Sequence, residues 1–127
     1  KLTLLIYIFS LLILSINLTS QHKEPTAISQ LRNYLENYNE PVTIVTNPLI
    51  NFYLTSTGVQ TNFINIDNNQ KIYNNNLLTK NTFMIGDYHK KISNTIIIQD
   101  DTSFYHNPYV NRMWSEINIY NLSESDE

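Results

Sequence analysis

The chain of 127 residues has eight basic and eleven acidic side chains, a formal net charge of -3, and no cysteine. This balance argues against the broad basic surface that binds nucleic acid, and the lack of thiols excludes disulfides, thiolate catalysis and cysteine-based zinc sites. After a hydrophobic lead segment is subtracted, the length suffices for one modest domain and leaves no room for a second.

The chain begins with a hydrophobic segment that carries no charged side chain between Leu2 and Ile16. We predict a transmembrane helix over residues 1–20, the last span of a larger protein that was cut or processed before Lys1. As a helix, the run to Leu18 measures about 25 Å, slightly short of the roughly 30 Å hydrocarbon core, so one more upstream turn is expected. A cleaved signal peptide and a buried core helix remain alternatives, although Leu18 suits a cleavage site poorly.

Residues 21–122 are predicted to form one extracytoplasmic α/β domain. Apolar side chains at helical spacing over residues 27–38 indicate an amphipathic helix, and the β-branched run over residues 42–46 indicates a buried strand. A second helix is predicted to begin with Asn47 as its N-cap and to end at Gly58.

The second half of the domain is richer in predicted strands. They are expected at residues 59–66, 82–86, 94–99 and 116–121. This alternation predicts a small, three-layer-like α/β domain with a mostly parallel sheet of about four to five strands. The apolar run Ile96 to Ile98 predicts a central strand that is buried on both faces. The acidic residues 123–127 are predicted to form a disordered tail.

The residue pattern contains no strong catalytic motif. With only two glycines, the chain has neither a phosphate-binding loop nor a dinucleotide-binding turn. Asp100 and Asp101, at the predicted end of the fourth strand, could hold a metal ion, and Asp87 with His89 could exchange protons. Turn and cap roles are the favoured alternatives for all four. The histidines lack metal-ligand spacing, so we assign no catalytic residue, metal ligand or cofactor in this chain.

The most distinctive string covers residues 104–115, where aromatic and amide side chains gather around an arginine and the single tryptophan. Aromatic faces stack on sugar rings, amides exchange hydrogen bonds, and arginine pairs with phosphate through two parallel hydrogen bonds. The predicted substrate-binding residues are Tyr105, His106, Asn107, Tyr109, Asn111, Arg112 and Trp114. The alternative is that the apolar members of this string pack it onto the sheet while the rest face water.

These features together resemble the C-terminal end of a known class of polytopic membrane glycosyltransferases. The hydrophobic lead, the helix at residues 27–35, the strand and helix at residues 42–54 and the string HNPYVNRMW at residues 106–114 carry the likeness. They are similar to the tails of the dolichyl-phosphate-mannose-protein mannosyltransferase-like family (family 39, GT-C class). The resemblance covers nearly the whole chain.

The resemblance implies an inverting transferase that moves a sugar from a polyprenyl- or dolichyl-phosphate donor onto a glycan, lipid or protein acceptor outside the cytosol. The family's catalytic aspartate lies in an early extracytoplasmic loop, and no residue of this chain matches it, so this part alone is expected to be inactive. The implied location is the plasma or inner membrane, and a divalent metal remains open for the full-length enzyme. A secreted or single-pass α/β binding module without activity and a structural or assembly domain remain the alternatives.

Overall fold

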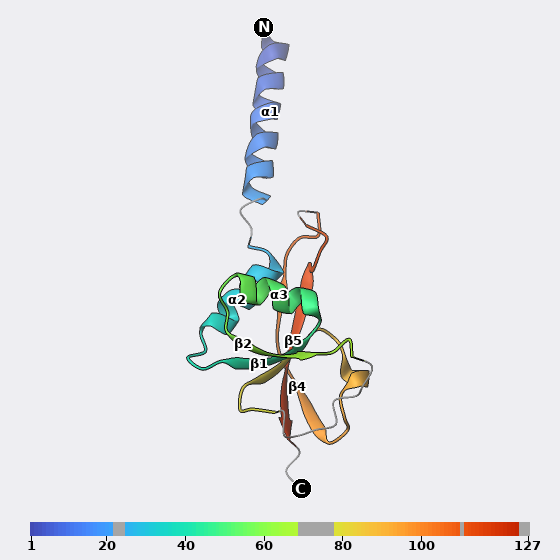
Figure 1. Cartoon of the computed structure of the whole chain (residues 1–127). Coiled ribbons are helices and arrows are strands. Elements are labelled where there is room, and N and C mark those ends of the chain that lie inside the picture. Colours follow the sequence, from blue (N-terminus) through green and yellow to red (C-terminus); the bar gives the residue numbers. More distant parts are fainter. Residues whose placement is uncertain (22–24, 69–77, 110, 125–127) are drawn as a thin grey trace.

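The computed structural model describes residues 1–21, 25–68, 78–109 and 111–124. Helix α1 (Leu2–Gln21) stands apart from the α/β domain (Figure 1). Its two described serines donate to carbonyl oxygens one turn earlier, Ser10 to Tyr7 at 2.8 Å and Ser15 to Leu12 at 2.9 Å. Among the described residues, no helix is both long enough and apolar enough to cross a membrane.

The first half of the domain follows the predicted order of helix, strand, helix and strand. These elements are α2 (Ala27–Glu36), β1 (Val42–Thr46), α3 (Pro48–Ser56) and β2 (Thr61–Asn65). Asn47 caps α3 as predicted, since its Oδ1 accepts the Ile50 N–H at 3.0 Å. After α3 the chain turns through Gly58 at φ 98°, a left-handed conformation that favours glycine.

The second half supplies three strands and a short 3₁₀ helix. They are β3 (Thr82–Ile85), η2 (His89–Lys91), β4 (Ile96–Tyr105) and β5 (Glu116–Glu124). All strands join one five-stranded sheet in the order β2-β1-β3-β5-β4. The pairs β1–β2 and β1–β3 are parallel, whereas β3–β5 and β4–β5 are antiparallel. The sheet is therefore mixed, with two parallel and two antiparallel strand pairs. Strand β5 alone runs against the other four strands, because the connection that joins β4 to β5 is too short for a crossover.

The predicted third layer is also absent from the described part of the chain. Both α2 and α3 pack on one face of the sheet, where Leu31 and Leu54 share a core cluster with Ile44 and Phe83. The opposite face buries Val45, Met84, Ile96 and Leu122 beneath segments around Ile66, Leu78 and Ile92. Within the described ranges, β1–α3–β2 is the one helical crossover, and no described α-helix covers this second face.

Three predictions about the C-terminal strands need correction. The run Ile96 to Ile98 lies in β4, which is an edge strand rather than a central one, and the Ile97 side chain is 41% exposed. Asp100 and Asp101 lie inside β4 rather than after it, since β5 pairs along its whole length. Strand β5 also runs through Ser123 and Glu124, which we had placed in the tail, while residues 125–127 lie outside the described residues.

Candidate functional site

The predicted substrate loop lies at the edge of the sheet where the parallel strands end. Thr46 closes β1 there, and its hydroxyl donates to the carbonyl oxygen of Ile85 at 3.0 Å. The Gly86 N–H continues the pairing of β3 with β5 by donating to Asn118 at 2.9 Å. Because β5 runs antiparallel to β3, the loop that enters β5 meets this carboxyl edge, where open α/β sheets place their ligands. We take this edge as the candidate site.

His106 fixes the base of the loop and is only 2% exposed. Its Nδ1 accepts the Ala27 N–H at 2.8 Å, and its Nε2 lies 2.8 Å from the carbonyl oxygen of Asn111. Since one ring nitrogen faces a donor and the other an acceptor, these partners assign the neutral imidazole with hydrogen on Nε2. His106 therefore ties the first turn of α2 to the loop, and no nitrogen of its ring is left for a ligand.

The two loop asparagines serve local turns. Asn107 Oδ1 accepts the Tyr109 N–H at 3.0 Å, and Asn111 Oδ1 accepts the Met113 N–H at 2.9 Å. Both are Asx turns, in which a side chain replaces a backbone acceptor two residues before the donor. The amide oxygens are thus engaged in shaping the loop.

Trp114 anchors the far end of the loop. It is half-buried against the cluster between the helices and the sheet, and its φ of 51° is the left-handed conformation that non-glycine residues rarely adopt. The neighbouring Ser115 carbonyl accepts the His106 N–H at 2.9 Å and closes the loop. Packing of the indole offsets a backbone strain of about 1–3 kcal/mol, so the indole serves mainly as a structural anchor.

The remaining predicted residues face solvent. Tyr109 is 92% exposed, and Tyr105 and Arg112 are also exposed. The Tyr105 backbone carbonyl accepts a hydrogen bond from Gln30 Nε2 at 3.1 Å. The exposed Tyr105 ring can contact other molecules. The structure thus brings the seven predicted residues together on one loop but divides them into a structural base and an exposed tip.

Asp87 and His89 follow β3 at the same edge. Asp87 Oδ1 lies 2.5 Å from His89 Nδ1, and the imidazole packs edge-on against Tyr120 with the ring centres 4.7 Å apart. The hydrogen bond from His89 lowers the pKa of the Asp87 carboxyl from its ordinary range. Burial is the main cause that raises the pKa of Tyr120, and the negative charge of nearby carboxylates, Asp87 first among them, adds to it. Both side chains of the pair are exposed to solvent.

The Tyr88 ring occupies the space beside Gly86 at this turn. Gly86 has φ 100°, and a Cβ at this position would lie 2.8 Å from the Tyr88 ring. The Tyr88 hydroxyl in turn accepts a hydrogen bond from Asn47 Nδ2 at 3.3 Å. The role of Tyr88 could not be predicted from the sequence, because its hydrogen-bond partner Asn47 lies 41 residues away.

Asp101 takes part in a different cluster, on the helical face of the sheet. The register of β4 shifts between Asp100 and Thr102, and Asp101 accepts the Tyr34 hydroxyl at 2.6 Å. Tyr34 also lies 3.2 Å from Tyr38, hydroxyl to hydroxyl. Burial first, and the bond to Asp101 second, raise the pKa of Tyr34 well above its ordinary value. The carboxylate thus orders a tyrosine pair, and among the described residues no group of three or more acidic or histidine side chains could hold a metal ion.

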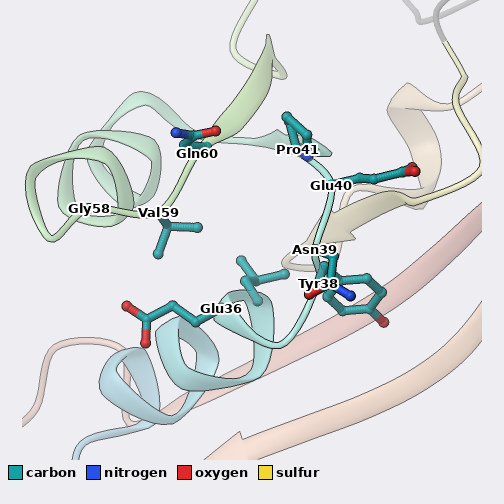
Figure 2. Close-up of a pocket in the computed structure, with 9 residues that line it drawn as sticks. Glu36, Tyr38, Asn39, Glu40, Pro41, Gly58, Val59 and Gln60 are labelled. Atoms are coloured by element: carbon teal, nitrogen blue, oxygen red, sulfur yellow. The ribbon is translucent and has the colours of Figure 1, made fainter.

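A separate hollow of about 210 Å³ lies at the opposite edge, beside the start of β1 and the ends of α2 and α3. Figure 2 shows Gly58, Val59 and Gln60 on one side of it and Glu36 with Tyr38 on the other. Glu36 already accepts from Arg32 at 2.9 Å. No predicted site residue lines this hollow.

No family model matches the sequence, and searches of curated proteins and of solved structures find no similar protein.

Proposed function

We propose that this chain is the membrane-anchored, non-catalytic end of an integral membrane glycosyltransferase. In this proposal α1 inserts into the plasma or inner membrane and the α/β domain lies on the extracytoplasmic side. The catalytic aspartate belongs to sequence upstream of this chain. The full-length enzyme would move a sugar from a polyprenyl- or dolichyl-phosphate donor onto a glycan, lipid or protein acceptor.

The observation that carries the anchoring is the surface of α1. The exposed fractions of its large apolar side chains range from 47% for Ile13 to 75% for Leu2, and they lie all around the helix. A helix that is apolar on every side needs a protein core or lipid around it. Leaving such a surface in water costs about 25 cal/mol for each Å² of apolar area. A bilayer removes this cost, and complete spanning requires the further upstream turn that the segment length indicates.

The transferase part of the proposal rests on the family resemblance, above all on the string at residues 106–114. A non-catalytic role is consistent with the exposure of Asp87 and His89, whose contact is open to solvent. The resemblance places the catalytic carboxylate elsewhere in the enzyme. This domain would then shape or cover the active site rather than perform the reaction.

Within the loop, the exposed tip is the part that we propose contacts the donor phosphate or the acceptor. Arg112 is the loop's only cation, and Tyr105 and Tyr109 offer exposed ring faces. A guanidinium recognises phosphate through two parallel hydrogen bonds, which an ammonium group cannot reproduce. We therefore expect Arg112→Lys to weaken sugar transfer by the full-length enzyme and Arg112→Ala to weaken it further.

The test compares these variants with a matched control, because the chain contains one other arginine. Arg32 lies on α2 in an exposed ion pair with Glu36, and Arg32→Ala should leave transfer unchanged. Transfer from a polyprenyl-phosphate sugar and thermal unfolding are measured on the same preparations. Wild-type transfer in Arg112→Ala would refute the substrate contact, whereas a fall matched by lost folding would show that the loop acts through stability.

The exposure of Asp87 and His89 to solvent also fits a second candidate. A single-pass, membrane-anchored binding module would need α1 and the exposed loop but no upstream enzyme. The upstream coding sequence separates the two. Further hydrophobic spans with an early acidic loop support the transferase, and a start codon immediately before Lys1 supports the binding module.

A further inference from the structure

Helix α3 carries apolar side chains on two sides. Ile50 and Leu54 point into the core, whereas Leu49 and Phe52 are 66% and 71% exposed. Leu49 and Phe52 are three residues apart, so they lie next to each other on the outer side of the helix. The core already accounts for the inner side, and this outer pair has no role in the packing of the domain.

The tip of the loop carries a second exposed apolar pair. Tyr109 and Met113 are 92% and 60% exposed, beside Arg112, and the loop from residue 106 to residue 115 contains no acidic side chain. The tip therefore combines an aromatic ring, a flexible apolar chain and one cation. This combination is typical of side chains at a membrane interface, where aromatic rings and cations sit at the level of the headgroups.

The loop is tethered close to α1. Helix α1 ends at Gln21, and the Ala27 N–H binds His106 at the loop base at 2.8 Å. Six residues of fully extended chain reach at most about 20 Å, so the loop base cannot lie farther than this from the end of α1. Figure 1 shows α2 and α3 on the side of the sheet towards α1, and the loop rising towards the lower end of α1.

We infer that Leu49, Phe52, Tyr109 and Met113 form a lipid-contacting face, which rests on the surface of the bilayer that holds α1. The inference depends on the proposed insertion of α1, and the tether is what selects lipid as the occupant. With α1 in the bilayer, the loop base stays within about 20 Å of the membrane surface. The tip then meets headgroups, with Arg112 able to reach their phosphates, and the outer pair of α3 extends the contacting face. The α/β domain would lie flat against the membrane rather than extend into solvent.

The chain has no cysteine, so single labels can be introduced without a background. Phe52→Cys and Tyr109→Cys report the proposed face, and Ile8→Cys reports α1. Gln60→Cys, an exposed position at the opposite edge, is the aqueous control. Each full-length chain carries a bimane label in phosphatidylcholine vesicles, with and without a mixture of lipids that carry nitroxide quenchers near the headgroup and along the acyl chain.

We expect the nitroxide lipids to reduce the fluorescence of labels at positions 8, 52 and 109 and to leave position 60 unchanged. Quenching at position 8 with positions 52 and 109 as bright as position 60 would overturn the lipid-contacting face and leave the anchoring intact. This is also the result if another protein covers the face. An unquenched label at position 8 would overturn the insertion of α1, and the lipid-contacting face with it.

Discussion

Replacement of His106 by alanine should destabilise the domain although the residue lies in a loop. The imidazole is buried and connects the turn at Asn111 to the start of α2, where its partner Ala27 lies 79 residues before His106 in the sequence. His106→Ala leaves the Ala27 N–H without its acceptor and the Asn111 carbonyl without its donor. Water replaces the lost hydrogen bond of the buried Ala27 N–H poorly, whereas the Asn111 carbonyl is only partly buried.

The expected loss follows from these two groups. A buried donor or acceptor without a partner costs about 1–3 kcal/mol, so the Ala27 N–H alone predicts a loss of about 1–3 kcal/mol in the free energy of unfolding. The partly buried Asn111 carbonyl adds a smaller loss. Two substitutions divide the effect. His106→Asn keeps an acceptor near the position of Nδ1, and His106→Gln keeps a donor near that of Nε2, so each should lose less than alanine does.

Urea unfolding of the full chain in detergent, followed by the fluorescence of Trp114, measures these differences. Tyr109→Ala is the matched control in the same loop, because its ring is almost fully exposed and its loss should change stability by no more than about 0.5 kcal/mol. If His106→Ala unfolds at the same urea concentration as Tyr109→Ala, the bridge does not stabilise the domain. The assignment of His106 to a structural role would then be wrong.

Three further predictions test the sheet and the two titrating clusters. Ile96→Asp should lower the free energy of unfolding by about 3 kcal/mol or more, because Ile96 is buried. Ile97→Asp, on the exposed side of the edge strand, should lower it by about 1 kcal/mol or less. Equal urea midpoints for the two variants would contradict the edge position of β4. His89→Ala should raise the pKa of Asp87 towards its ordinary value, as followed by the NMR shift of its carboxyl carbon, since the bond from His89 is the main cause of the lowering. A lowered carboxyl pKa stabilises the fold above the pKa of the unfolded chain and loses this effect as pH falls through the folded value, so acid should destabilise His89→Ala less. Asp101→Asn should lower the pKa of Tyr34 but leave it raised, because burial is the larger cause; a Tyr34 ring-carbon titration that does not move would exclude the contact. The raised Tyr34 pKa contributes stability below the unfolded tyrosine pKa of 10.0 and loses it as pH rises further, so the variant should lose less stability in alkali.

Local patterns predicted the first half of the domain well. The apolar spacing of α2, the β-branched run of β1 and the Asn47 cap of α3 are encoded within a few residues each, and the structure confirms all three. Gly58 was also placed correctly as the stop after α3. Such signals succeed because capping and periodicity act between neighbours in the sequence.

The errors concern contacts between distant segments. The apolar run Ile96 to Ile98 predicted a central strand, but the position of β4 at the edge depends on its pairing with β5 alone. The same pairing extends β4 through Asp100 and Asp101, where a local reading expected a turn. Periodicity describes one strand and carries no information about its neighbours in the sheet.

The candidate site shows the same limit. The string around Trp114 was predicted to bind substrate, with packing as the alternative, and the structure assigns structural contacts to His106 and Trp114 while it exposes Tyr109 and Arg112. The role of His106 could not be predicted, because its donor, the Ala27 N–H, is a backbone group without a sequence signature. The contact between Asp87 and His89 could be predicted from the sequence, since only one residue separates them.

Flotation of the chain with phosphatidylcholine vesicles after an alkaline wash tests the membrane anchoring most directly. The matched variant replaces Leu5 and Leu12 of α1 by aspartate, each of which costs about 2.5–3.5 kcal/mol near the centre of a bilayer. Neither residue contributes to the core clusters of the domain, so the variant should keep its fold. We predict that the wild-type chain floats with the vesicles and that the variant remains in the dense fraction. A wild-type chain that stays in the dense fraction with its domain folded would contradict the account.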